Sequence, residues 1–288
     1  MIKILVTGGR GQLAQCLNHV IRKHAGLDVD FQDLPDLDIT NVQQLTSYFS
    51  KNKLNYCINC AAFTDVDLAE EQSELAYAVN AEGPKNIAML CLKHNVKLIH
   101  LSTDFVFDGK KDTPYLETDA PNPLSVYGAS KLQGEQNIQH NMDNYFIIRT
   151  SWLYSEYGNN FLKTMLKLSE THKQLNVVSD QIGSPTNAGD LAEFLIKIVL
   201  SSSTNYGVYH YSNLGAISWY NFTCGIFAQF KRNVEVRPIK TKEYPTAAKR
   251  PMYSVLDTKK SENNFGCIIK KWRQGLEGLQ NDIKLIMQ

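Results

Sequence analysis

The chain opens on the pattern that decides its fold, the stretch Lys3-Ile4-Leu5-Val6-Thr7-Gly8-Gly9-Arg10-Gly11-Gln12-Leu13-Ala14. A short apolar run leads into G-x-x-G-x-x-A, after which apolar residues recur at helical spacing. Gly8 allows a tight turn, Gly11 lets the backbone approach a pyrophosphate, and Ala14 permits close packing of helix on strand. The N–H groups that open the helix are free to bind phosphate. Strand, turn and helix in this order predict a dinucleotide-binding unit.

The first half of the chain alternates strands with helices. Apolar runs predict strands at residues 3–7, 29–31, 56–59, 98–102 and 145–149. Periodic segments predict helices at residues 12–24, 42–52, 73–95 and 129–141. This alternation is typical of an α/β protein with a Rossmann-type, doubly wound parallel sheet.

Three polar or glycine-rich segments follow predicted strands. They are residues 8–13 after the first strand, Ala61-Ala62-Phe63-Thr64 after the third, and Ser102-Thr103-Asp104 after the fourth. Ligands of such sheets bind beyond the carboxyl ends of the strands. We therefore expect the three segments to share one edge of the sheet and to form a site there.

The segment Tyr127-Gly128-Ala129-Ser130-Lys131 places a phenol and an ammonium four residues apart. On a helix this spacing puts both groups on one face. A neighbouring ammonium favours the phenolate, so we expect the pKa of Tyr127 to fall from its ordinary value of about 10. Such a tyrosine can exchange a proton with a carbonyl or alcohol oxygen. Alone, the pattern also fits a solvated surface pair, but beside a nucleotide site it predicts catalysis.

The acid that binds the adenosine ribose is expected about 20 residues beyond the glycines. Asp30 and Asp33 both lie at this distance, and the sequence does not choose between them. No lysine or arginine occurs between Lys23 and Lys51, which leaves Arg10 as the candidate partner for a 2′-phosphate. These features favour NADH and leave the use of both NADH and NADPH open.

Composition narrows the class of protein. With 288 residues the chain can hold one large domain or two modest ones, and its net charge of +1 argues against nucleic acid as a partner. No apolar run is long enough to span a membrane and the N-terminus is already a strand, so we expect no membrane partner and a cytoplasmic location. Cys57 and Cys60 match C-x-x-C without a second pair, and the histidines show no ligand spacing, so no metal site is expected.

After Arg149 the alternation gives way to polar, aromatic loops that carry glycine and proline. We interpret residues 1–150 as an NAD(P)-binding domain, with segments near 175–210 returning to it. Residues 151–288 are then mainly a substrate-binding subdomain. Trp152 lies one step beyond a strand end and is expected in the cleft.

A series of segments, in order, is similar to a known family. They read GGRGQLA, NCAAFTDVDLAE, HLSTDFVFDG, ETDAPNPLSVYGASKLQGE, RTSWLY, GNNFLKTML, VVSDQIGSPT and SWYNF. From residue 1 to about residue 257 the chain resembles the dTDP-4-dehydrorhamnose reductases, a family of extended short-chain dehydrogenase/reductases. The resemblance implies transfer of a nicotinamide hydride to C4 of dTDP-6-deoxy-L-lyxo-4-hexulose, which yields dTDP-L-rhamnose for polysaccharide synthesis.

The resemblance also implies roles for individual residues. Tyr127 would donate the proton to the nascent C4 alkoxide, Lys131 would hold the nicotinamide ribose, and Thr103 would bond the sugar oxygen. Asp104 and Trp152 would line the sugar pocket. The motif and the resemblance together predict as cofactor-binding residues Gly8, Arg10, Gly11, Gln12, Leu13, Asp38, Ile39, Ala62, Phe63, Thr64, Leu101, Tyr127 and Lys131.

Departures from the family pattern leave alternatives open. Phe105 stands where many members have tyrosine, and it also replaces the second carboxyl of the Thr-Asp-Glu motif of nucleotide-sugar dehydratases. A reductase that makes another dTDP-6-deoxyhexose remains an alternative, as does a regulatory subunit of methionine adenosyltransferase. Some members dimerise with a divalent cation, but Gln15-Cys16-Leu17 offers no carboxylate, which weakens that expectation here. Both a monomer and a homodimer stay open.

Overall fold

A six-stranded parallel sheet forms the centre of the computed structural model, which describes residues 1–279. Its strands, in the order β10-β5-β4-β3-β1-β2, have the bounds β1 (Ile2–Thr7), β2 (Leu27–Gln32), β3 (Tyr56–Asn59), β4 (Lys97–Thr103), β5 (Tyr145–Thr150) and β10 (Gly207–His210). All neighbouring strands in it are parallel. The predicted Rossmann-type α/β fold is confirmed, and β10 is a strand that the sequence pattern missed.

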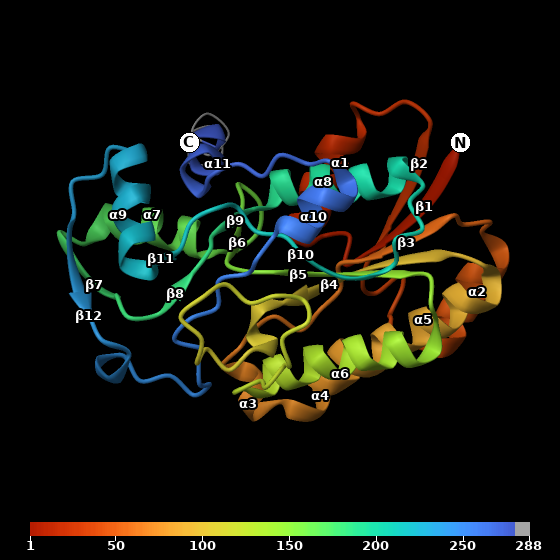
Figure 1. Ribbon diagram of the computed structural model, residues 1–288, viewed down its shortest axis with the longest axis horizontal. Coiled ribbons are helices and arrows are strands. Elements are labelled where there is room, and N and C mark those ends of the chain that lie inside the picture. Colours follow the sequence, from red (N-terminus) through yellow and green to blue (C-terminus); the bar gives the residue numbers. More distant parts are fainter. Residues whose placement is uncertain (280–288) are drawn as a thin grey trace.

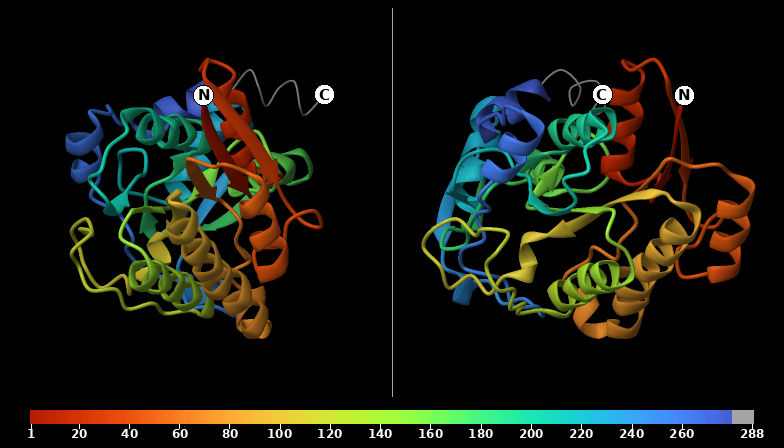
Figure 2. Two further views of the ribbon diagram at one scale, coloured as in Figure 1. Left: turned by 90° about the vertical axis from the view of Figure 1, so that its right-hand side faces the viewer. Right: turned by 45° about the vertical axis from the view of Figure 1, so that its right-hand side comes forward.

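Helices cover both faces of the sheet (Figure 1). One face carries α1 (Gln12–Ile21), α8 (Ala188–Ser201) and α10 (Lys259–Phe265), and the other carries α2 (Val42–Lys51), α5 (Gly83–His94) and α6 (Val126–Asn141). Figure 2 shows the sheet enclosed between these two layers. A hydrophobic core lies on each face of the sheet, and alternate residues of β1 point into one or the other. Ile4 and Val6 pack with α1 and α8, whereas Leu5 packs with α2 and α5.

The strand order reverses at β1, which pairs with β2 on one side and with β3 on the other. Such a reversal opens a crevice at the carboxyl ends of the strands. In this crevice Thr7 is in register with Asn59, and Asn59 is in register with His100. Three polar side chains therefore lie in one row across the sheet.

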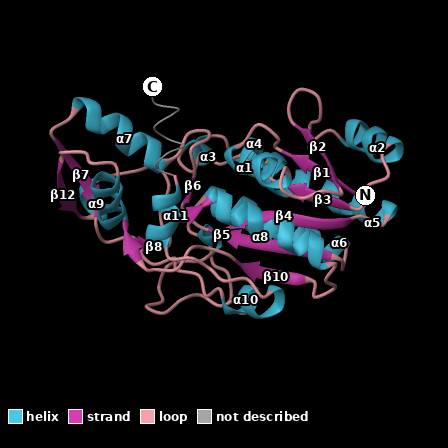
Figure 3. Ribbon diagram, turned by 90° about the horizontal axis from the view of Figure 1, so that it is seen from above, coloured by secondary structure: helices cyan, strands magenta, loops and turns pink. Residues whose placement is uncertain are grey.

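The segments after β5 build a smaller unit beside the sheet (Figure 3). Its elements are β6 (Leu153–Tyr154), α7 (Phe161–Thr171), β7 (Gln174–Val178), β8 (Ile182–Gly183), β9 (Thr186–Asn187), β11 (Ile217–Ser218), α9 (Trp219–Gln229), β12 (Glu235–Ile239), η3 (Thr241–Glu243) and α11 (Trp272–Gly278). Its core contains Tyr154, Phe222 and Trp272. Between these elements, α8 and β10 return to the sheet, whereas β7 pairs with β12 outside it. Residues 280–288 of the predicted subdomain lie outside the described residues.

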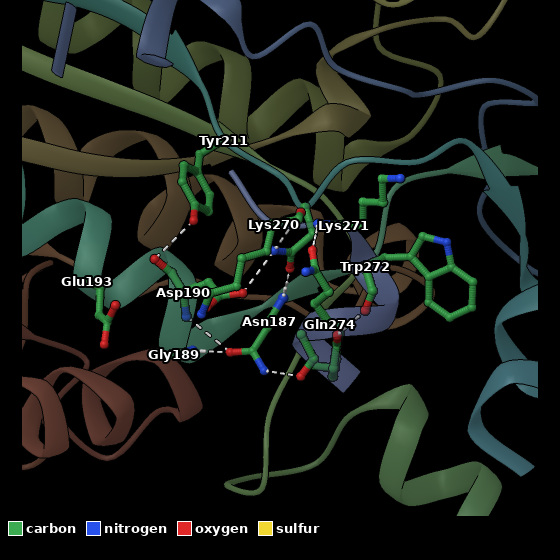
Figure 4. Close-up of polar contacts among 12 residues, drawn as sticks. Asn187, Gly189, Asp190, Glu193, Tyr211, Lys270, Lys271, Trp272 and Gln274 are labelled. Carbon is green, nitrogen blue, oxygen red and sulfur yellow. Dashed lines mark hydrogen bonds and ion pairs between the residues drawn. The ribbon is translucent and has the colours of Figure 1, made fainter. Parts of the chain in front are cut away.

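Side chains at the start of α8 tie the C-terminal segment to the rest of the molecule (Figure 4). Asn187 caps α8 by accepting the N–H groups of Gly189 and Asp190, and its own amide donates to the carbonyl of Gly275 at 2.9 Å. Lys270 forms an ion pair with Asp190 at 2.6 Å. Helix α11 and the segment before it are thereby attached to α8, which packs on the central sheet.

The helix predicted over residues 73–95 is interrupted. It consists of α4 (Ser73–Tyr77), a π-helical turn η1 (Ala78–Glu82) and α5, and it is preceded by α3 (Leu68–Glu71). The π-turn lies against α6 where Gly134 faces Asn80, and a Cβ on Gly134 would overlap the Asn80 backbone oxygen. Side-chain periodicity carries no signal for this change of helical pitch, which often marks a functional site.

This close approach yields a stability prediction. Gly134→Ala should lower the free energy of unfolding by about 1–3 kcal/mol, the usual cost of overpacking. This loss is expected even though alanine is more favourable than glycine inside a helix by up to ~1 kcal/mol, because the clash costs more than that gain. Urea denaturation measures the change.

Gly278→Ala is the matched control, because no atom of residues 1–279 lies within 4 Å of the Cβ that it would add. This variant should be at least as stable as the wild type. Equal stability of the two variants would show that α6 and η1 have room to separate.

Candidate active site

Helix α6 positions Tyr127 and Lys131 because it begins earlier than the predicted residue 129. The side chain of Ser125 accepts the N–H of Gly128 at 3.2 Å, so Tyr127 lies in the first helical turn. A Cβ on Gly128 would overlap the carbonyl oxygen of Phe105. Glycine at this position thus lets the helix approach the end of β4.

Lys131 lies inside the protein, with 2% of its surface exposed. Its Nζ donates to the carbonyl of Leu101 at 2.6 Å. Burial lowers the pKa of Lys131 to about 8, although the charges of Glu135 and Cys60 oppose this shift. Lys131 is therefore mainly an ammonium at pH 7, and it loses its proton as the pH rises through about 8.

The prediction that Lys131 lowers the pKa of Tyr127 is wrong. Burial raises the pKa of Tyr127 to about 12, the Thr103 hydroxyl opposes the rise, and Asp104 adds to it. The ring of Phe105 meets the Tyr127 ring edge-on, with the centroids 5.6 Å apart. Desolvation of the phenolate is the largest cause, and Lys131 is not among the groups that shift this pKa; its Nζ donates to the Leu101 carbonyl. The phenol keeps its proton at neutral pH.

Thr103 and Asp104 continue β4 into the short 3₁₀ turn η2 (Asp104–Val106). The Thr103 hydroxyl donates to Asp104 Oδ1 at 3.2 Å and accepts the N–H of Phe105 at 3.2 Å. Asp104 is 2% exposed, and its Oδ2 has no hydrogen-bond partner among the described residues. Burial raises the pKa of Asp104 to about 7, so this carboxyl is partly protonated at neutral pH.

Trp152 has a left-handed backbone, with φ of 46°. This conformation costs about 1–2 kcal/mol for a residue other than glycine. The indole lies against Gly183 and stacks on Trp219, with ring centroids 3.4 Å apart and planes 7° from parallel. Sequence patterns did not indicate the partner Trp219, because it begins a helix far along the chain. Strain of this kind is characteristic of functional sites.

The glycine turn has the geometry that a pyrophosphate requires. Gly8 has φ of 66°, and a Cβ on it would lie 2.7 Å from the backbone nitrogen of Ala61. No side chain caps the N-terminus of α1 at Gly11. The Gln12 amide reaches the other unit, where its oxygen accepts from Ser155 at 3.2 Å, while the Leu13 side chain is buried in the core. Only the backbone of Leu13 can therefore face a ligand.

Asn80, which the sequence patterns missed, holds the loop after β3. Its oxygen accepts the N–H of Phe63 at 2.8 Å, and its amide donates to the Phe63 carbonyl at 3.0 Å. The same amide donates to Ser130 on α6 at 3.1 Å. Ala62 and Thr64 flank the residue so held, which keeps this predicted segment beside α6.

The predicted cofactor-binding residues beyond the glycine turn separate in space. Asp33 accepts the backbone N–H of Arg10 at 2.8 Å and therefore lies at the glycine turn, whereas Asp30 accepts from Tyr48 and Gln32. Asp38 accepts from the N–H and hydroxyl of Thr40.

The two remaining residues of this group also have defined places. Ile39 is buried against Gly83 at the start of α5. Arg10 is exposed and reaches Asp36 at 3.9 Å. Of the predicted acids, Asp33 is thus the one that the fold brings to the turn.

The described part of the chain, residues 1–279, contains no group of three histidine, cysteine or carboxylate side chains placed to hold a metal ion. No helix in the same residues is long and apolar enough to cross a membrane. The six cysteines, Cys57 and Cys60 among them, are free thiols.

A glycine turn at the reversal of a parallel sheet, with a half-buried tyrosine and a buried lysine on the helix beside it, defines a nucleotide-dependent reductase of the short-chain dehydrogenase/reductase class. The family model described as the RmlD substrate binding domain matches residues 2–284. The chain belongs to this family, that of the dTDP-4-dehydrorhamnose reductases.

Individual members of the family are similar to this chain over nearly its full length. The dTDP-4-dehydrorhamnose reductase of Aggregatibacter actinomycetemcomitans is 41% identical over 97% of this chain and 99% of its own. A crystal structure of a dTDP-4-dehydrorhamnose reductase from Clostridium acetobutylicum is 42% identical, covers 100% of both chains and superposes with a TM-score of 0.94. The corresponding Bacillus anthracis structure, a complex with NADP, is 39% identical with a TM-score of 0.94, and covers 98% of this chain and 100% of its own.

The charges around the ribose residues predict a cofactor preference. Asp33 and Asp36 oppose a 2′-phosphate, because like charges a few ångströms apart repel by about 1 kcal/mol even in water. We expect NADH to be used at least as well as NADPH, and Arg10→Ala to impair NADPH selectively. Measurements of kcat/KM with each cofactor test both expectations. A preference of more than about tenfold for NADPH would contradict the first.

Proposed function

We propose that this protein reduces the C4 keto group of dTDP-6-deoxy-L-lyxo-4-hexulose to dTDP-L-rhamnose, with NADH or NADPH as the hydride donor. The observation that carries the proposal is the gathering of Tyr127, Thr103 and Lys131 at the carboxyl edge of the sheet, beside the glycine turn. Its full-length relatives are named for this activity.

The chain's own residues fit a dinucleotide. The left-handed Gly8 leaves no room for a side chain between the turn and Ala61, and the uncapped N-terminus of α1 presents free N–H groups for a pyrophosphate. In this proposal Asp33, which accepts the N–H of Arg10 in the glycine turn, binds the adenosine ribose, and Lys131 binds the nicotinamide ribose. When bound, the nicotinamide supplies the hydride.

Tyr127 is suited to act as an acid. With a pKa raised to about 12, the phenol is protonated at neutral pH and can give its proton to the oxygen that becomes an alkoxide. Thr103, at the end of β4, supplies the second hydrogen bond to that oxygen. A tyrosine in this state favours reduction over oxidation, since the reverse reaction would require a phenolate.

Asp104 and Trp152 form the proposed sugar-facing wall. Asp104 lies beside Thr103 at the end of β4, and Trp152 offers an apolar face held by Trp219. Phe105, packed against Tyr127, places an apolar edge where elimination of water would need a second carboxyl. Simple carbonyl reduction is the chemistry that remains.

The proposal includes two broader features of the protein. Residues 1–150 with α8 and β10 bind the cofactor, and most of the remainder binds the sugar nucleotide. The protein is a cytoplasmic monomer or homodimer, and analytical ultracentrifugation distinguishes the two assemblies.

The direct test follows NADH absorbance after addition of the dTDP-4-keto-6-deoxy sugar, with NMR identification of the product. Formation of dTDP-L-rhamnose supports the proposal. A dTDP-6-deoxytalose product would point to the alternative reductase. Inertness toward every such sugar, together with retained cofactor binding, would favour the regulatory-subunit alternative.

Tyr127→Phe should lower kcat by about 10²–10⁴, the range for loss of a general acid, and leave NADH affinity nearly unchanged. Stopped-flow turnover and fluorescence titration of NADH measure the two quantities. Wild-type turnover in this variant would remove Tyr127 from the mechanism.

Lys131→Met should weaken NADH binding as well as turnover, because in this proposal Lys131 holds the nicotinamide ribose and with it the hydride donor. The contrast with Tyr127→Phe separates the two roles. A variant that loses turnover but binds NADH normally would show that Lys131 does not hold the ribose.

A further inference from the structure

A row of buried polar side chains runs from β1 to Lys131, and three of its members, Thr7, Asn59 and His100, have no role in the proposed reduction. The Thr7 hydroxyl donates to Asn59 Oδ1 at 2.7 Å, and the Asn59 amide nitrogen lies 3.0 Å from Nδ1 of His100. Nε2 of His100 lies 3.5 Å from Nζ of Lys131. Each of these four side chains is at most 2% exposed.

The amide of Asn59 has only one orientation that satisfies its neighbours. The backbone N–H of Ala61 donates to Oδ1 at 3.2 Å, and so does the Thr7 hydroxyl. The reverse orientation would place the amide NH₂ against the Ala61 N–H, two donors facing each other. Oδ1 therefore faces Ala61, and the NH₂ group donates to Nδ1 of His100.

His100 carries a single ring proton. Burial, and then the nearby charge of Lys131, lower its pKa well below the ordinary value, so the imidazole is neutral. Because Nδ1 accepts from Asn59, the proton is on Nε2. The Nε2–H group consequently faces the nitrogen of Lys131.

We propose that His100 is a positioning residue that presents this N–H to Lys131 and thereby favours the neutral amine over the ammonium. A neutral amine satisfies every contact in the site. It donates to the Leu101 carbonyl, accepts from His100 through its lone pair, and keeps one N–H for a ligand. An ammonium would have no lone pair for the His100 proton.

The other groups around Lys131 act in known directions. Glu135, on α6, and Cys60, after β3, favour the ammonium, whereas burial disfavours it. Tyr127 is protonated and neutral near pH 7. His100 on β4 is the group that brings a polar N–H toward the lysine nitrogen, so its removal should raise the pKa of Lys131 from about 8.

The consequence for catalysis rests on the proposed function. Below its pKa Lys131 is an ammonium that can hold the ribose, and above it the charge is lost. NADH affinity should therefore fall as pH rises through about 8. With His100 holding the two forms of Lys131 close in energy, the lysine can take up and release a proton within one catalytic cycle.

The first experiment needs no variant and no activity. In the full-length protein labelled with ¹⁵N-histidine, long-range ¹H–¹⁵N correlation spectra identify which nitrogen of His100 is protonated, with His100→Gln for assignment. A proton on Nε2 is expected. A proton on Nδ1, or a doubly protonated ring, would overturn the proposal.

The second experiment titrates labelled lysine by NMR, with Lys131→Met for assignment. His100→Gln should raise the midpoint of Lys131 by at least one pH unit, about a tenfold gain in proton affinity, because its side-chain carbonyl can accept from the ammonium. The pH at which NADH affinity falls should move upward with it.

His210→Gln is the control, since His210 is equally buried but bonds to the carbonyl of Tyr115. It should leave the Lys131 midpoint unchanged. A folded His100→Gln protein with the wild-type midpoint would overturn the proposal. Both measurements are independent of turnover, so absence of reductase activity would count against the proposed function alone.

Discussion

The candidate site depends on one buried contact, the hydrogen bond from Lys131 Nζ to the carbonyl of Leu101. It joins α6 to the carboxyl end of β4, and a lysine placed so deep is stable only because its nitrogen has polar partners. Gly128 removes the side chain that would keep the helix away from Phe105. With the helix this close to the end of β4, the Tyr127 side chain lies beside Thr103.

Two asparagines hold the loops around this contact. Asn59 joins β1 to β3 and orients His100, and Asn80 holds both backbone groups of Phe63 while bonding Ser130 on α6. Buried amides of this kind are worth most when every donor and acceptor is satisfied. They make the edge of the sheet a rigid platform, which pre-organised catalysis requires.

The smaller unit contributes Trp152 to the candidate site, and backbone strain and aromatic stacking fix the position of this residue. Trp152 keeps an unfavourable left-handed backbone because Trp219 and Gly183 enclose its ring, and Gln12 bridges the nucleotide turn to the loop at Ser155. This part of the candidate site is therefore built by the segments after β5, separately from the glycine turn and the helix that carries Tyr127 and Lys131.

The sequence by itself determined the parallel sheet, the glycine turn and the spacing of Tyr127 and Lys131, because these follow from local periodicity and from the backbone freedom of glycine. It could not place Asn80, His100 or Trp219, whose roles arise only when distant strands and helices meet. It also misjudged the pKa of Tyr127, since spacing indicates which charges are near but not how much water is removed. Burial is a property of the whole packed molecule, and it decided the protonation state of both Tyr127 and Lys131.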